Sequence, residues 1–246
     1  MNIKLVHLLL DPNFPADIPE EKWKSVIDKQ QQSIDSFSKV KSHFVSYTQQ
    51  FSKVNRTELP VDTCAVPELL KDSLNEDIND VAISYGHYGA FKAHSRALKH
   101  EFSDDIDAII IIEGDVVLTV PPDEFISNIK ESLLYGQRND ASFITFGELK
   151  LGVRGNDNVW ADVEYLEKYN KVPHFLCCHC YMVFPKEREN IRFRLETTKW
   201  HAFDIWLFWR YDRRVRMFST KNKLVTEAEG YSVIDLTSKK DGKYLN

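Results

Sequence analysis

Two carboxylates interrupt the most apolar stretch of the chain. Glu113 and Asp115 directly follow the isoleucine run 109–112, and only Gly114 separates them. In an extended backbone, residues i and i+2 project to the same side, so the two acids would face one site. Gly114 would remove a side chain between them and let a bulky group approach the backbone.

Carboxylate oxygens at this spacing suit a divalent cation. Mg²⁺ and Mn²⁺ prefer such ligands, and an ion held by few protein groups keeps room for phosphate oxygens. We therefore expect Asp115 and Glu113 to hold Mn²⁺ or Mg²⁺, which would neutralise charge on a departing diphosphate. The alternative is a strand end whose acids simply reach water. The spacing alone does not decide between the two.

The elements that must position these acids alternate between strand and helix in the first half of the chain. This alternation predicts an α/β fold with a mostly parallel central sheet flanked by helices. Ligands bind beyond the carboxyl ends of such strands, which is where residues 113–115 would lie. The predicted strands are 3–10, 41–50, 107–119, 141–149, 174–185, 215–218 and 231–235. The predicted helices are 20–37, 86–102, 123–137 and 201–211, and 52–80 reads as a long loop with a short helix.

Bulk properties exclude several classes of protein. The chain has 246 residues and a formal net charge of −5. A net negative charge argues against a nucleic-acid binder, because neutralising phosphates needs a basic surface. The apolar opening 3–10 is too short to span a bilayer and lacks a cleavage site, so we expect a cytoplasmic protein.

Three cysteines surround one histidine in the run Cys177-Cys178-His179-Cys180. The composition invites a zinc interpretation. Neighbouring side chains on a strand point to opposite faces, however, and cannot all converge on one ion. Reduced, half-buried thiols are the preferred interpretation.

Four blocks in order resemble glycosyltransferase family 25, the lipooligosaccharide galactosyltransferase group. Residues 86–94 resemble the family's Gly-x-x-Gly-Cys-x-x-Ser-His helix, and 109–119 resemble its strand ending in Glu-Asp-Asp. Residues 180–186 resemble its later His-Ala-Tyr strand, and 203–207 its Val-Asp-x-x-Leu segment. Gly114 replaces the middle acid, and no histidine follows His201 to serve as a late metal ligand.

The resemblance implies a single GT-A (Rossmann-like) glycosyltransferase domain over 1–246, with a smaller mixed region on the acceptor side. Residues up to about 120 would form the nucleotide-sugar-binding half, and about 121–246 the acceptor and catalytic half. The acid-x-Asp pattern of Glu113, Gly114 and Asp115 would be the DxD-like motif that binds metal and UDP-sugar.

The resemblance also implies a role for Asp204, and the sequence itself gives candidate roles for His87, Tyr88 and His94. Asp204, in an aromatic helix, would be the base that deprotonates the acceptor hydroxyl in an inverting reaction. A helix N-terminal carboxylate favoured by the macrodipole is the alternative. His87 and Tyr88, at a glycine-flanked helix start, would face a phosphate or form a plain turn. His94 would contact the donor or serve structurally.

A basic strip follows the aromatic helix. It could hold the diphosphate, dock on anionic lipid near a lipid-linked acceptor, or be solvated surface. A lipid contact would make the protein peripheral to the inner face of a membrane. The strip consists of Arg210, Arg213, Arg214, Arg216, Lys221 and Lys223.

The sequence thus predicts a metal-dependent hexosyltransferase that moves a sugar from a UDP-sugar to a glycan or lipid-linked glycan acceptor. Surface polysaccharide or lipooligosaccharide synthesis is the implied setting. Two alternatives stay open. A metal-dependent phosphoesterase would use the same acids to activate water, although no histidine lies within ten residues of them. A non-catalytic nucleotide-sugar or glycan-binding module would bind UDP without turnover.

Overall fold

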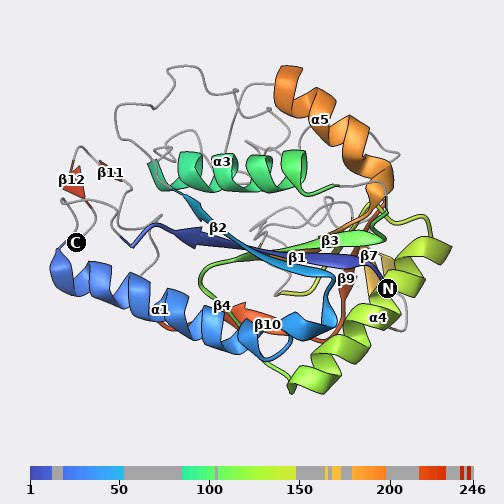
Figure 1. The fold of residues 1–246 in the computed structure, drawn as a ribbon, viewed down its shortest axis with the longest axis horizontal. Coiled ribbons are helices and arrows are strands. Elements are labelled where there is room, and N and C mark those ends of the chain that lie inside the picture. The colour runs from blue at the N-terminus through green and yellow to red at the C-terminus, as the bar shows by residue number, and fades with distance from the viewer. Residues whose placement is uncertain are drawn as a thin grey trace.

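An eight-stranded sheet forms the centre of the part of the chain that the structure describes (Figure 1). The structure is a computed structural model, and it describes residues 1–12, 19–52, 85–102, 105–147, 164–165, 168–172, 179–197, 216–230, 239–240 and 243–244. The sheet strands are β1 (Ile3–Leu10), β2 (Ser46–Ser52), β3 (Ala108–Glu113), β5 (Phe143–Thr145), β6 (Glu164–Tyr165), β7 (Tyr169–Val172), β8 (Cys180–Val183) and β9 (Met217–Thr220).

The strand order across this sheet is β2-β1-β3-β8-β5-β9-β7-β6. β1 runs parallel to β2 and β3, and β9 runs parallel to β5. β8 is antiparallel to both of its neighbours, and β7 is antiparallel to β9 and β6. Six strands therefore run one way and two run against them, which confirms the predicted mostly parallel α/β sheet.

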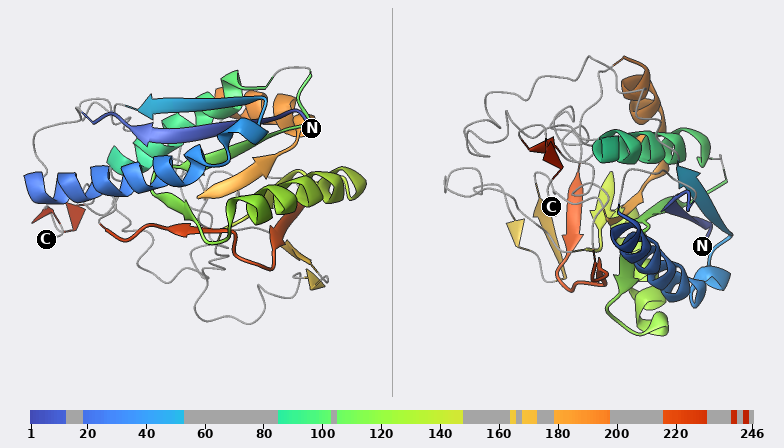
Figure 2. Two further views of the ribbon diagram at one scale, coloured as in Figure 1. Left: turned by 60° about the horizontal axis from the view of Figure 1, so that its bottom comes forward. Right: turned by 90° about the vertical axis from the view of Figure 1, so that its left-hand side faces the viewer.

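Helices cover both faces of the sheet (Figures 1 and 2). α3 and α5 lie on one face, and α1 and α4 lie on the other. The helices are α1 (Glu20–Ser38), α3 (Tyr85–His100), α4 (Pro122–Arg138) and α5 (Arg188–Thr197), with short 3-10 turns η1 (Lys41–His43) and η5 (Pro185–Glu187).

The isoleucine run of β3 explains this layering. Ile109 and Ile111 pack in the core under α3 and α5, whereas Ile110 and Ile112 pack under α1 and α4. All four side chains are fully buried. Successive strand residues point to opposite faces, so a central strand covered on both sides must be apolar throughout.

Two small antiparallel pairs lie apart from the main sheet. β4 (Val116–Leu118) pairs with β10 (Val225–Glu227), and β11 (Lys239–Lys240) pairs with β12 (Lys243–Tyr244). β4 follows β3 after a two-residue turn, so β10 is brought next to the end of β3. This pairing carries a late part of the chain to the acidic motif.

Two differences between the sequence predictions and these elements concern β2 and α5. The predicted strand 41–50 begins with η1, and only residues from Ser46 onward pair. Helix α5 was not predicted. The predicted loop, from residue 53 to 80, the aromatic helix 201–211 and the strand 231–235 lie outside the described residues. None of the described helices combines the length and the apolar character needed to cross a bilayer.

Candidate metal centre at the end of the central strand

The side chains of Glu113 and Asp115 lie close together, but the backbone that joins them is a turn and not a continuous strand. Glu113 is the last residue of β3, and Gly114 and Asp115 form the turn into β4. The expected extended backbone is therefore wrong at this point. Oxygens of Glu113 and Asp115 nevertheless lie within 4.8 Å of each other and of a ring nitrogen of His179. The side-chain oxygens of the two acids therefore lie close together at the carboxyl end of β3.

His179 joins the acids from the neighbouring strand. It directly precedes β8, and the Glu113 backbone N–H donates to the His179 carbonyl at 2.8 Å. Its Nδ1 lies 2.7 Å from Glu113 Oε2, and its Nε2 lies 2.7 Å from Glu227 Oε1 at the end of β10. One imidazole thus bridges two carboxylates from different strands.

His94 reaches Glu113 from the other side. Its Nε2 lies 3.0 Å from Glu113 Oε1, and its Nδ1 lies 2.8 Å from the Tyr181 hydroxyl. His94 is 1% exposed and comes from α3, whereas Tyr181 is on β8. Each oxygen of the Glu113 carboxylate therefore faces a histidine.

These contacts set the charge of Glu113. Burial alone would raise the pKa of its carboxyl group, but hydrogen bonds from His179 and His94, and their charges, outweigh burial. The net result is a pKa well below the usual range. Glu113 is therefore a carboxylate at neutral pH.

Asp115 has the opposite electrostatic environment. Burial and then repulsion by Glu113 raise the pKa of its carboxyl group, while His179 and Lys29 oppose the shift. Lys29 of α1 is 3% exposed and places Nζ 3.5 Å from Asp115 Oδ2. The charge on Asp115 is thus unfavourable in the folded protein unless further positive charge is supplied.

The donor set fits a divalent cation. Two carboxylate oxygens and one imidazole nitrogen lie within 4.8 Å of one another, close enough to contact a single ion. Carboxylates suit Mg²⁺ and Mn²⁺, and the imidazole donor favours Mn²⁺ over Mg²⁺. Asp115, Glu113 and His179 are the residues that would hold it.

Gly114 serves the protein's own packing. A Cβ added there would lie 2.8 Å from the Leu8 carbonyl oxygen and 3.2 Å from Gln30 Oε1. The Gln30 amide in turn accepts from the Leu10 N–H at 2.7 Å and donates to its carbonyl at 3.1 Å. The chain itself fills the space that we expected a bulky ligand to occupy. The close approach also explains why residue 114 is a glycine.

Several predicted residues lie outside the described part. These include Asp204, Cys177, Cys178, Arg210, Arg213 and Arg214. His87 and Tyr88 lie in the first turn of α3, but their side chains are also outside it. Cys180 is fully buried, and burial raises the pKa of its thiol. Arg216 of the basic strip donates to the Asn139 carbonyl at 3.0 Å.

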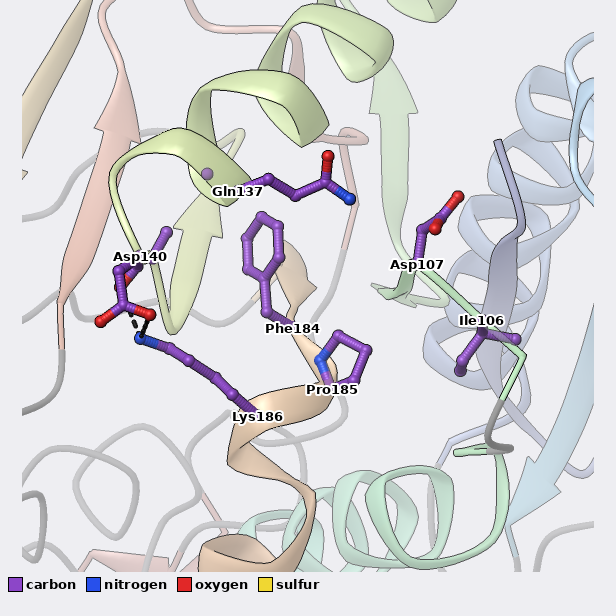
Figure 3. Close-up of a pocket in the computed structure, with 9 residues that line it drawn as sticks. Ile106, Asp107, Gln137, Asp140, Phe184, Pro185 and Lys186 are labelled. Carbon is purple, nitrogen blue, oxygen red and sulfur yellow. Dashed lines mark hydrogen bonds and ion pairs between the residues drawn. The ribbon is translucent and has the colours of Figure 1, made fainter.

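A separate hollow lies near the amino end of β3, at the opposite end of this strand from Glu113 (Figure 3). Its volume is about 280 Å³, and Phe184, Pro185, Asp107 and Asp140 are among its lining residues. Asp140 is engaged by Lys186, whose Nζ lies 2.9 Å from Oδ1. Because Asp107 precedes β3 and Glu113 ends it, this hollow is remote from the acidic motif.

Sequence reasoning missed His179 and Glu227. His179 was placed in the cysteine run, although a signal existed: His179-Cys180-Tyr181 supplies the histidine and tyrosine of the family's His-Ala-Tyr pattern. Glu227 lies in no motif. Its position follows from the pairing of β10 with β4, in which Glu227 is opposite Val116.

Comparisons with known proteins place little constraint on the function. No protein-family model matches the chain, and no curated protein sequence matches it. A solved glycosyltransferase involved in glycosylation of the major capsid of PBCV-1 is 11% identical, with 94% of this chain and 95% of that chain covered and a TM-score of 0.44. S. aureus TarS 1–349 is 10% identical, over 93% of this chain and 60% of that chain, with a TM-score of 0.46.

A third solved structure is galactosyltransferase LgtC in complex with donor and acceptor sugar analogs. It is 11% identical, with 92% of this chain and 87% of that chain covered and a TM-score of 0.42. These scores do not establish a common fold.

Proposed function

We propose that this protein is a cation-dependent glycosyltransferase that moves a hexose from a UDP-sugar to a glycan acceptor. The observation that carries the proposal is the convergence of Glu113, Asp115 and His179 within 4.8 Å at the carboxyl end of the parallel strands. The ordered resemblance of four sequence blocks to glycosyltransferase family 25 supports the same chemistry.

The residues of the site have distinct tasks in this proposal. Asp115, Glu113 and His179 would hold Mn²⁺, or Mg²⁺, which supplies positive charge to a leaving diphosphate. Lys29 stabilises the charge on Asp115, and Glu227 orients His179 through its Nε2. In metal sites, such outer carboxylates fix the orientation of a ligating imidazole.

Three further roles rest on the sequence alone. Asp204 is proposed as the base that takes the proton of the acceptor hydroxyl, which gives inversion at the anomeric carbon. His87 and Tyr88, in the first turn of α3, are proposed to contact the donor phosphates, because helix N-termini favour anions. The acceptor is proposed to be a lipid-linked glycan of surface polysaccharide or lipooligosaccharide synthesis, made at the inner face of a membrane.

A nucleotide-sugar assay tests the proposal. The protein is incubated with Mn²⁺, a panel of nucleotide sugars and candidate glycan acceptors, and release of UDP is followed. We expect release from one UDP-sugar in the parent and a loss of at least 100-fold in Asp115→Ala. Asp28→Ala removes an exposed carboxylate of α1 that pairs with Lys24 and should retain full activity.

A metal-dependent phosphoesterase is the second candidate. The sequence argued against it because no histidine lies near the acids along the chain, but the structure brings His94 and His179 to Glu113. Such enzymes use metal-bound sites to activate water. Hydrolysis of simple phosphodiesters, without sugar transfer, would replace the glycosyltransferase proposal with this one.

The same assay identifies a non-catalytic module. Tight UDP binding without release from any sugar, in the presence of acceptors, would show that the site binds but does not turn over. The Asp204→Asn variant separates cation binding from sugar transfer. In a transferase it should abolish transfer and leave Mn²⁺ binding unchanged, since Asp204 has no proposed role in holding the cation.

A further inference from the structure

His94 has no free ring nitrogen for a ligand. Both nitrogens lie within hydrogen-bonding distance of protein groups, Nε2 of Glu113 and Nδ1 of Tyr181. The imidazole is 1% exposed, so a donor sugar or nucleotide in solution cannot reach it without displacing these partners. His94 therefore contacts Glu113 from the buried side of the acidic motif.

The hydrogen bonds fix which nitrogen carries the proton. Glu113 is a carboxylate and can only accept, so the His94 Nε2 must donate to Oε1. The Tyr181 hydroxyl lies 2.8 Å from the other ring nitrogen, Nδ1. Tyr181 therefore holds the ring with Nε2 directed at Glu113, as a partner of one histidine nitrogen commonly does.

Ring packing fixes the orientation of the imidazole as well. The His94 and Tyr181 rings are stacked, with centroids 5.7 Å apart and planes 22° apart. Tyr181 is itself fully buried and packs against Phe143, at a centroid distance of 6.4 Å. The support behind Glu113 is thus built from α3 and β8 and is closed to solvent.

We propose that His94 is a positioning residue: held by Tyr181, it fixes the Glu113 carboxylate so that Oε2 faces His179 and the cation position. This inference deepens the proposed function and rests on its cation site. It assigns His94 a role in metal affinity in place of donor contact. Outer partners of this kind typically change metal affinity by about 10- to 100-fold when removed.

A pair of amide substitutions separates the two ring nitrogens. In His94→Gln the side-chain N–H can reach the position of Nε2 and donate to Glu113. In His94→Asn the shorter amide reaches only the position of Nδ1, next to Tyr181. Mn²⁺ is titrated into each variant without nucleotide, and the electron paramagnetic resonance signal of the free ion gives the affinity. We expect the Gln variant to stay within about threefold of the parent and the Asn variant to lose 10- to 100-fold.

Two further variants complete the experiment. Tyr181→Phe keeps the stacked ring but removes the hydroxyl, and it should weaken Mn²⁺ binding by a few-fold because His94 loses its hydrogen-bond partner at Nδ1. Lys99→Gln changes an exposed residue of the same helix and should have no effect. Circular dichroism melts in EDTA show whether each variant is folded.

The outcomes separate this inference from the proposed function. Equal Mn²⁺ affinity in the parent and a folded Asn variant overturns the positioning role and leaves the cation site standing. Equal losses in the Gln and Asn variants overturn the assignment to Nε2. If the parent itself binds no Mn²⁺, the cation site of the proposed function fails, and the positioning role fails with it.

Discussion

Glu113 and Asp115 are two residues apart and carry opposite pKa shifts. Hydrogen bonds from two histidines overcome burial and hold the pKa of Glu113 low, so its charge stabilises the fold. Burial and the Glu113 charge raise the pKa of Asp115, so its charge destabilises the fold. The first acid is a structural anchor, and the second is maintained at a cost in stability, as is common for functional residues.

We predict opposite stability effects for the two amide variants. In EDTA at pH 7, Glu113→Gln should lower the free energy of unfolding by roughly 1–3 kcal/mol, because it removes charge-assisted hydrogen bonds. Asp115→Asn should raise it. A raised pKa means that the penalty is present at pH above the folded pKa and is relieved as the pH falls through it. Urea unfolding measures both changes.

Added Mn²⁺ provides the control for this pair. Ligand that binds only the folded state raises its stability. The parent should therefore gain stability with Mn²⁺, and Asp115→Asn should gain little. A destabilised Asp115→Asn variant in EDTA would contradict the electrostatic description of this residue.

At the scale of elements, α4 packs very closely against the residue that follows β8, and the contact between Gly136 and Phe184 leaves no room for a larger side chain. A Cβ added at Gly136 would lie 2.0 Å from Phe184 Cζ, at the end of β8. Alanine normally stabilises a helix interior relative to glycine by about 0.5–1 kcal/mol. Here the ring of Phe184 occupies the space that the alanine methyl group would need. Gly136→Ala should therefore destabilise the protein.

We predict that Gly136→Ala destabilises the protein by about 1–3 kcal/mol, the usual range for overpacking. Phe184→Leu in the same background should recover part of the loss, and a double-mutant cycle by urea unfolding measures the coupling. Ser127→Ala, at an exposed position of α4, should change stability by less than about 0.5 kcal/mol. Additive effects of Gly136→Ala and Phe184→Leu would contradict this prediction.

The strands and helices around the site could be predicted because their patterns are local. Ile109 to Ile112 indicate a strand buried on both faces, and the spacing in 123–137 indicates α4. Partners that depend on strand order could not be predicted. His179 reaches Glu113 only because β8 lies next to β3, and Glu227 only because β10 pairs with β4.

At the scale of the whole molecule, a buried histidine makes the fold sensitive to acid. His7 on β1 is fully buried, and its nitrogens contact Tyr47 at 2.8 Å and Ser33 at 2.9 Å. Burial lowers the pKa of His7 to about 4. The neutral ring ties together β1, β2 and α1, so its protonation opposes the packing of three elements.

We predict a loss of stability between pH 6.5 and about 4. A histidine with a lowered folded pKa contributes its stability fully above its unfolded pKa and loses it as the pH falls toward the folded value. The difference corresponds to roughly 3 kcal/mol. Urea unfolding between pH 7.5 and 4.5 measures the slope.

Two variants test the assignment of this slope. His7→Leu should remove most of it, whatever its effect at pH 7.5. His43→Gln, at an exposed position in η1, should retain it. An unchanged slope in a folded His7→Leu variant would assign the acid sensitivity to other groups. Glu113 affects stability at lower pH than His7 does. Its stabilising charge is lost only below the pKa of its carboxyl group in the unfolded chain, about 4.5.

The hydrogen-bonded chain from Tyr181 through His94, Glu113 and His179 to Glu227 draws on α3, β3, β8 and β10. These residues are synthesised at different times, and Glu227 is made long after Glu113 and His179. A nascent polypeptide still lacking that glutamate holds Glu113 without its full set of neighbours. Maturation of the centre therefore waits until the ribosome has made residue 227.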